Sequence, residues 1–146
     1  MDLLLLNGPN LNRLGKREPD VYGHETLADI EKRIRLLCSD HEVGLSCFQS
    51  NYEGALIDRI HQAADEGTKG IVFNPGAYTH TSIAIRDAIA SVDIPVVEVH
   101  ISNIHKRESF RQKSMLAPVC LGQISGLGTV GYELATHALL RKIERD

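Results

Sequence analysis

The sequence contains no tryptophan, and aromatic residues make up only 5% of it. Its three cysteines, Cys38, Cys47 and Cys120, are widely spaced and form no C-x-x-C pair. Neither a disulfide framework nor a zinc knuckle is therefore indicated. An odd number of unpaired thiols is typical of a reducing compartment, and we expect a cytoplasmic protein.

Long apolar runs are also missing. The longest extends from Met115 to Leu121, counting Pro118, whereas a membrane span needs roughly 18 residues. Asp2 interrupts the apolar stretch at the N-terminus, which is therefore unlike a secretion signal. We expect neither membrane insertion nor export.

The chain has no excess of positive charge. Its 16 lysines and arginines face 19 acidic residues, which gives a formal net charge of -3. Such a chain has no overall positive electrostatic field that would hold a polyanion, so we expect no nucleic-acid partner.

Seven histidines are present, but no H-E-x-x-H motif or Cys/His grouping accompanies them, so we expect no metal site.

What the sequence does contain is a regular alternation of short apolar runs and amphipathic segments. With 146 residues, of which 42% are hydrophobic, residues 1–146 are expected to form a single domain. The pattern predicts five strands, at 3–6, 43–49, 70–73, 95–99 and 118–123. It predicts helices after Thr26, over about 56–66 before Gly67, over 81–90, and from about Gly128 to near the C-terminus.

Buried strands that alternate with helices indicate a parallel sheet covered on both faces, with right-handed crossovers. For five strands in a chain of this size, we predict an α/β protein with a flavodoxin-like, three-layer α/β/α sandwich. The predicted order of the parallel strands is 2-1-3-4-5.

Polar residues gather where the predicted strands end. In sheets of this kind, ligands bind beyond the carboxyl ends of the strands. The residues at these ends are Gly8, Pro9, Asn10 and Asn12, then Ser50 and Asn51, then Asn74, Pro75 and Gly76, and finally His100, Ser102 and Asn103. His80 is expected at the same edge, and this edge is therefore the predicted site.

Two basic segments flank this edge. The connection over about 8–25 is long for a strand-to-helix loop and contains Arg13, Lys16, Arg17 and Tyr22. Such loops are commonly lids or binding loops, so we predict a lid here. A second basic cluster, at 106–111, follows the fourth strand, and together the two segments are suited to enclosing a small anion.

Two glycine motifs at first suggest nucleotide binding. Residues 126–131 satisfy G-x-G-x-x-G, but only a terminal helix follows, whereas the dinucleotide fingerprint needs a second strand bearing an acid. Close packing of helix on sheet is the better use of these glycines. The segment from Gly8 to Lys16 has six residues between its glycines instead of four, and Arg17 replaces the Ser or Thr of a P-loop.

A polar edge without a metal cluster, a Ser-His-Asp arrangement or a nucleotide loop favours acid/base chemistry by tyrosine and histidine. The motifs here are N-G-P-N-L-N from Asn7, R-E-P-D-V-Y-G from Arg17, F-Q-S-N from Phe48, N-P-G-A-Y-T-H-T-S from Asn74 and E-V-H-I-S-N-I-H from Glu98. In this order, and over practically the whole length, the chain resembles the type II 3-dehydroquinate dehydratases.

The resemblance implies a hydro-lyase of the shikimate pathway that removes water from 3-dehydroquinate by trans elimination through an enolate, without a cofactor. It makes Tyr22 the general base, His100 the proton donor to the leaving hydroxyl, and Arg17 a lid residue that stabilises the transition state. The other positions it matches are Asn10 on the enolate side, substrate-binding Asn74, His80, Ile101, Ser102 and Arg111, and Asp87, an acid contributed to a neighbouring subunit. The assembly it implies is a homododecamer, built as a tetramer of trimers.

The chemistry of these residue types agrees with that assignment. Free tyrosine has a pKa of about 10, so a tyrosine base needs a nearby cation, and Arg17 is the candidate. Glu98 and His100 are two apart on a predicted strand and share a side of it, so we expect Glu98 to orient the imidazole. Arg13 and Lys16 make the lid more basic than the family pattern, and Tyr52 stands where a histidine is common.

The alternative class is a non-catalytic, flavodoxin-like ligand-binding module. A receiver domain would need acids where Asn7 and Asn74 stand, and a flavin carrier would need a phosphate loop with flanking aromatics. A different route to the same product runs through a Schiff base, which requires a lysine in a desolvated pocket. None of the six lysines is predicted to be buried.

Overall fold

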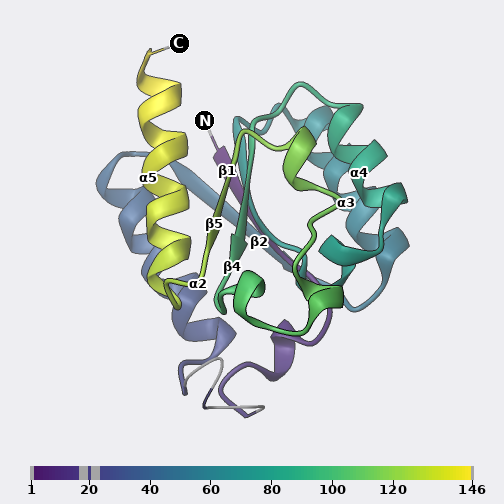
Figure 1. Cartoon of the computed structure of the whole chain (residues 1–146). Helices are drawn as coiled ribbons and strands as arrows, with labels where there is room; N and C mark the ends of the chain where they lie inside the picture. Colours follow the sequence, from purple (N-terminus) through teal and green to yellow (C-terminus); the bar gives the residue numbers. More distant parts are fainter. Residues whose placement is uncertain (1, 17–19, 21–23, 146) are drawn as a thin grey trace.

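Five parallel strands form one sheet in the order β2-β1-β3-β4-β5 (Figure 1). The structure is a computed structural model that describes residues 2–16, 20 and 24–145. The strands are β1 (Asp2–Asn7), β2 (Gly44–Gln49), β3 (Gly70–Asn74), β4 (Val96–His100) and β5 (Gly122–Ser125). The predicted strand order and α/β class are confirmed.

The two faces of the sheet carry separate helix pairs. In Figure 1, α2 (Leu27–Asp40) and α5 (Val130–Arg145) cover one face, while α3 (Glu53–Glu66) and α4 (Ile83–Ala90) cover the other. Strand β1 lies inside the sheet, between β2 and β3, and its leucines alternate between the two apolar clusters. Leu3 and Leu5 pack on the α2/α5 side and Leu4 and Leu6 on the α3/α4 side, all fully buried. This explains why β1 is a continuous apolar run.

The helix ends follow the predicted signals. Thr26 caps α2, because its Oγ1 accepts the backbone N–H of Asp29 while the Asp29 carboxylate accepts the backbone N–H of Thr26. Gly67 ends α3 with a φ of 77°, in the left-handed region that favours glycine. In α4 the helix begins at Ile83 rather than at Thr81, because the hydroxyl of Ser82 accepts the N–H of Ile85 as an N-cap.

The position predicted for the fifth strand was wrong. Residues 117–119 form a 3-10 turn that contains Pro118, and β5 starts only at Gly122. Proline has no N–H to donate to a ladder, and pairing with β4 begins at Leu121, whose N–H donates to the carbonyl of Val96. The apolar run 115–121 therefore closes the α3/α4 side of the core instead of forming a strand.

The glycine-rich turn before α5 serves packing, as expected. A Cβ on Gly131 would lie 3.3 Å from the Val99 side chain and 3.4 Å from that of Ile124, so the absence of a side chain brings α5 close to β4 and β5.

The first part of the predicted loop 8–25 is more regular than expected. It forms a 3-10 turn at Leu11–Arg13, and both Leu11 and Leu14 are buried in the core.

None of the described helices combines the length and apolar character that a membrane crossing requires.

Candidate active site

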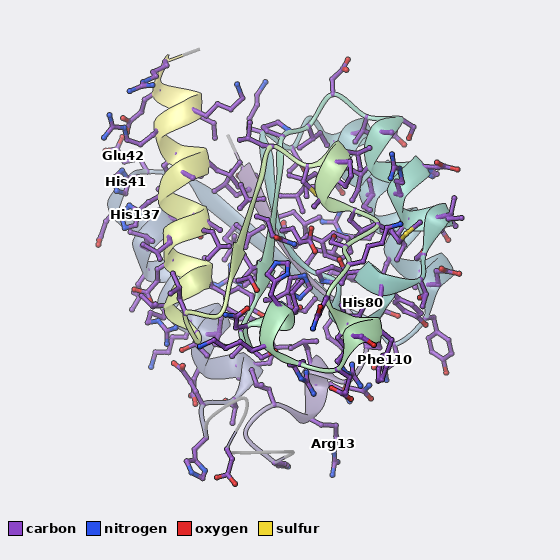
Figure 2. All side chains as sticks on the ribbon, viewed as in Figure 1. Arg13, His41, Glu42, His80, Phe110 and His137 are labelled. Carbon is purple, nitrogen blue, oxygen red and sulfur yellow. The ribbon has the colours of Figure 1, made fainter. Side chains whose placement is uncertain are left out.

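A hollow of about 130 Å³ opens at the carboxyl edge of the sheet. Its walls come from the segments that follow β1, β3 and β4, which is where polar residues gather in the sequence. Figure 2 shows His80 and Phe110 toward the end of the molecule where Arg13 of the first loop also lies. The lining residues are Pro9, Asn10, Leu11, Asn74, Gly76, Ala77, His80, His100, Ile101, Ser102, Ile104, Arg107 and Arg111.

The register of the sheet places two asparagines side by side under this hollow. Asn7 ends β1 and pairs with Asn74 at the end of β3. The hydroxyl of Tyr132, from α5, donates to Asn7 Oδ1 at 2.7 Å and accepts from Asn74 Nδ2 at 2.8 Å. Asn74 Oδ1 also accepts the backbone N–H of Gly76 at 3.1 Å. The Tyr132 hydroxyl and the Gly76 N–H therefore fix how the Asn74 side chain is presented to the hollow.

A carboxylate and an imidazole form a buried pair on β4. His100 Nε2 lies 2.5 Å from Glu98 Oε2, and both side chains are at least nine-tenths buried. The sequence spacing predicted this pair, and the structure confirms its geometry. Because Nε2 is engaged by Glu98, Nδ1 is the ring nitrogen left for a ligand, and it has no hydrogen-bond partner among the described residues.

Two hydroxyls complete the surroundings of Glu98. Thr79 Oγ1 donates to Oε2, and Ser114 Oγ lies 2.9 Å from both carboxylate oxygens. Burial works to raise the pKa of Glu98, but the hydrogen bond and charge of His100 and the two hydroxyls together hold that pKa below its ordinary value. The carboxylate is therefore a buried anion balanced by His100 and neutral donors.

His80 stands beside this pair. Its ring stacks on that of His100 with centroids 6.4 Å apart, and its Nδ1 donates to the carbonyl of Lys113 at 2.8 Å. Partial burial, together with the nearby His100 and Arg111, lowers the pKa of His80 despite this hydrogen bond. His80 is thus neutral at neutral pH, with Nε2 as a potential acceptor.

Cations line the outer wall. Arg111 packs 5.0 Å over the ring of Phe110, and its Nε donates to the carboxylate of Glu108 at 3.1 Å. A backbone hydrogen bond, followed by the hydrogen bond of Arg111 and the charges of Arg111 and Arg107, lowers the pKa of Glu108. Arg107 also lines the hollow. The wall therefore carries guanidinium groups suited to a carboxylate.

Asn10 lines the opposite side on a constrained backbone. It has a φ of 71°, and its N–H donates to Asn51 Oδ1 at 2.9 Å. Gly8, two residues earlier, passes so close to the loop after β3 that a Cβ there would lie 2.5 Å from the carbonyl oxygen of Pro75. The loops that follow β1 and β3 thus pack directly against each other.

A family model described as dehydroquinase class II matches residues 1–140. The chain belongs to this family. Among curated relatives, the 3-dehydroquinate dehydratase of Anoxybacillus flavithermus is 64% identical over 97% of this chain and 95% of its own length. That of Alkalilimnicola ehrlichii is 59% identical over 98% of this chain and 94% of its own. The type II dehydroquinase structure from Butyrivibrio crossotus superposes with a TM-score of 0.93 at 52% identity, covering 95% and 97% of the two chains.

The dehydroquinase resemblance inferred from the motifs is therefore confirmed, and a receiver domain or flavin carrier is not supported.

The structure brings together seven of the predicted site residues. Lining the hollow are Asn10, Asn74, His80, His100, Ile101, Ser102 and Arg111, and Glu98 lies directly behind His100. Asp87 is exposed on α4 and does not line the hollow. Tyr22 and Arg17 lie outside the described residues.

Four contributors were missed at the sequence level. Thr79 lies inside the motif that begins at Asn74 but was given no role there, Ser114 belongs to no quoted motif, and Tyr132 has the pattern of an ordinary core position of a helix. Arg107 was noted in the basic cluster but not as a site residue. Arg13 and Lys16 are exposed, and Tyr52, the departure from the family pattern, is 76% exposed at the start of α3.

No group of three or more His, Cys, Asp or Glu side chains able to hold a metal ion occurs in the part of the chain that the structure describes.

Proposed function

We propose that this dehydroquinase converts 3-dehydroquinate to 3-dehydroshikimate by trans elimination of water, as a hydro-lyase of the shikimate pathway that uses no cofactor. The observation that carries the proposal is the buried Glu98–His100 pair, which opens onto a hollow walled by Arg107 and Arg111. A buried acid beside a carboxylate site is what dehydration of a hydroxylated, carboxylated ketone requires. The names of the relatives identify that ketone.

His100 acts as the proton donor in this proposal. Glu98 holds Nε2, which fixes the ring, so a proton on Nδ1 points away from the pair. Transfer of that proton to the departing hydroxyl releases water. Glu98 does not touch the substrate and acts as a positioning residue.

The carboxylate of the substrate binds at the outer wall. The guanidinium of Arg111 offers parallel donors to a carboxylate, and Ser102 with the backbone at Ile101 supplies neutral donors opposite. Asn74 and neutral His80 accept or donate to the ring hydroxyls. Asn10 lies on the enolate side, where it stabilises the developing negative charge together with a bound water.

The base in this proposal is Tyr22, and the positive charge of Arg17 favours its ionised form. Both residues belong to the proposed lid over about 8–25. Both roles are inferred from the motif R-E-P-D-V-Y-G.

A direct assay tests the reaction. Purified protein is mixed with 3-dehydroquinate, and the conjugated enone of the product is followed by ultraviolet absorbance. His100→Asn should reduce kcat by about 10²- to 10⁴-fold, the usual contribution of a general acid. His61→Asn, at an exposed position of α3, is the matched control and should match wild type. No enone from the wild-type protein would overturn the proposal.

We further propose that the protein is cytoplasmic and assembles as a homododecamer, a tetramer of trimers, in which Asp87 serves a neighbouring site. Its carboxylate is exposed on α4, as a group that reaches another subunit must be in the isolated chain. Light scattering should give a dodecamer.

Mixed oligomers test the role of Asp87 directly. Asp87→Asn and Tyr22→Phe subunits, each nearly inactive alone, should regain activity when unfolded and refolded together. In the mixture, some sites join an intact Tyr22 to an intact neighbouring Asp87. Activity no higher than the sum of the separate variants would contradict the shared site.

A further inference from the structure

The hydroxyl of Ser114 has a fixed polarity. A hydroxyl offers one proton and two lone pairs. The backbone N–H groups of Leu116 and Ala117 donate to Ser114 Oγ at 3.1 and 2.9 Å, which occupies both lone pairs. Its single proton is therefore left for Glu98, whose two carboxylate oxygens each lie 2.9 Å away. Two incoming hydrogen bonds also polarise the hydroxyl and make it a stronger donor.

Thr79 follows the same logic. Its Oγ1 lies 2.9 Å from Ser114 Oγ, but both lone pairs of that oxygen are taken, so the proton of Thr79 goes to Glu98 Oε2. The carboxylate thus receives two neutral donors in addition to the imidazole of His100. Because Glu98 is completely buried, these donors replace the water that would otherwise solvate it.

Ser114 also ties the arginine-bearing segment to the pair on β4. Lys113 accepts from His80 through its carbonyl at 2.8 Å, and the N–H of Met115 donates to the carbonyl of Thr79 at 2.6 Å. Arg111 lies three residues before Ser114. Anchoring at 113–115 therefore connects the position of Arg111 to the Glu98–His100 pair.

We infer that Ser114 is a positioning residue that both holds the buried Glu98 carboxylate against His100 and helps to place Arg111. The inference rests on the proposed function, because it concerns the acid and the carboxylate site of that reaction. Thr79 also holds Glu98 through its hydroxyl, but its hydrogen bond to the segment that carries Arg111 is made by its backbone carbonyl, which a change of side chain leaves in place.

The direction of the effect follows from charge balance. When one hydroxyl is removed, less of the negative charge of Glu98 is met by neutral donors, and the carboxylate interacts more strongly with protonated His100. Loss of the His100 proton then needs a higher pH. Because the two groups titrate together, the shift belongs to the pair.

The other titratable and charged groups near the Glu98–His100 pair do not reverse the direction of this expected shift. Burial and the charge of Glu98 raise the pKa of the Cys120 thiol to about 12, so it stays neutral. His80 is neutral, and Arg107 and Arg111, which line the hollow, are cationic throughout the range of the experiment.

The test is the pH profile of kcat with 3-dehydroquinate for the full oligomeric enzyme. In Ser114→Ala the alkaline limb of the kcat profile should move to higher pH by roughly 0.5 to 1 unit, because the charged Glu98 carboxylate loses one hydrogen-bond donor. KM should rise several-fold, because the segment that carries Arg111 loses its side-chain link to Glu98 and keeps only the backbone contacts of Lys113 and Met115. Ser114→Thr, which keeps the hydroxyl, should restore the limb.

Two companion variants separate the two roles. Thr79→Val removes a buried hydroxyl with little change of shape, and it should move the limb in the same direction while KM stays close to wild type. If Ser114→Ala does not fold, Thr79→Val and Ser114→Cys are measured in its place. Ser109→Ala, an exposed serine in the same segment with no side-chain hydrogen bond to a described residue, should change neither quantity.

The outcomes separate the inference from the function. A uniform fall of kcat at every pH, with the alkaline limb unmoved in both Ser114→Ala and Thr79→Val, would overturn the positioning role while the function stands. An alkaline limb that moves to lower pH in these two variants would also overturn the positioning role. Absence of turnover in the wild-type enzyme would instead remove the proposed function.

Discussion

The hydroxyl of Tyr132 lies 2.8 Å from Asn74 Nδ2 and so links the terminal helix to a residue of the active-site hollow. Burial raises the pKa of this phenol, so it stays protonated and donates its own proton to Asn7. The carboxyl end of the sheet is thereby held from behind by α5. The site is consequently sensitive to a residue that does not line it.

Tyr132→Phe should weaken both folding and substrate binding. The variant leaves one donor and one acceptor without their buried partner, which costs about 1–3 kcal/mol of unfolding free energy each. KM should rise more than kcat falls, because Asn74 loses its orientation while the acid and base are untouched. Urea unfolding and steady-state kinetics measure the two effects.

The control for this variant is Tyr52→Phe, at a tyrosine that is 76% exposed. It should leave stability and KM within error of wild type. Equal behaviour of the two variants would show that the buried hydroxyl does not hold Asn74.

Acid should destabilise the protein in two steps. The pKa values of His80 and Glu98 are both lowered by folding, from 6.5 and 4.5, so each group contributes stability above its unfolded value. That stability is lost as pH falls through the folded value. The unfolding free energy should therefore decline first below about 6.5 and again below about 4.5.

Urea unfolding as a function of pH checks this prediction. Glu98→Gln should be less stable at neutral pH but should lack the lower step. Asp65→Asn, at an exposed position of α3, is the control and should retain both steps. A wild-type protein whose stability does not change between pH 7 and 4 would contradict the assignment.

Much of the fold follows from local signals in the sequence. The leucine run of β1, the capping residue Thr26 and the stop at Gly67 each depend on neighbours along the chain, and each was predicted correctly. Strand β5 was misplaced because the run 115–121 is as apolar as a strand. The burial of this run on the α3/α4 side depends on distant contacts that a local pattern does not contain.

The site was predictable to the extent that it lies in continuous motifs at strand ends. Glu98 and His100 share a strand, so their spacing alone predicted the contact. Thr79, Ser114 and Tyr132 act through hydrogen bonds to residues 16 to 125 positions away in the chain, and although Thr79 lies in a motif, no local pattern shows which distant group each of them contacts.

Tyr22→Phe should lower kcat by several orders of magnitude while leaving the fold and most ligand binding intact, because it removes the proposed base alone. Arg17→Ala should reduce kcat more than binding, since its charge is needed most in the transition state. Steady-state kinetics and calorimetric binding of a substrate analogue measure both. Turnover of Tyr22→Phe within about threefold of wild type would remove Tyr22 as the base.

An enolate route and a Schiff-base route make different demands on the lysines of this chain. A lysine that forms an imine must be neutral, and therefore desolvated, beside the substrate. Lys16, Lys32, Lys69, Lys106 and Lys113 are exposed, and no lysine is among the described residues that line the hollow. Lys142 is half-buried, but it lines a separate hollow with Lys69 and Pro95, at the amino end of β3 and β4.

Activity should therefore survive treatment with borohydride in the presence of 3-dehydroquinate, and mass spectrometry should find no adduct. Borohydride without substrate is the control for non-specific damage, and a known imine-forming enzyme treated in parallel shows that trapping works. The hydroxyl-lined pair at Glu98 and His100 predicts acid/base chemistry alone. Substrate-dependent inactivation with a covalent mass on any of the six lysines would overturn the enolate route, even though the overall reaction would stand.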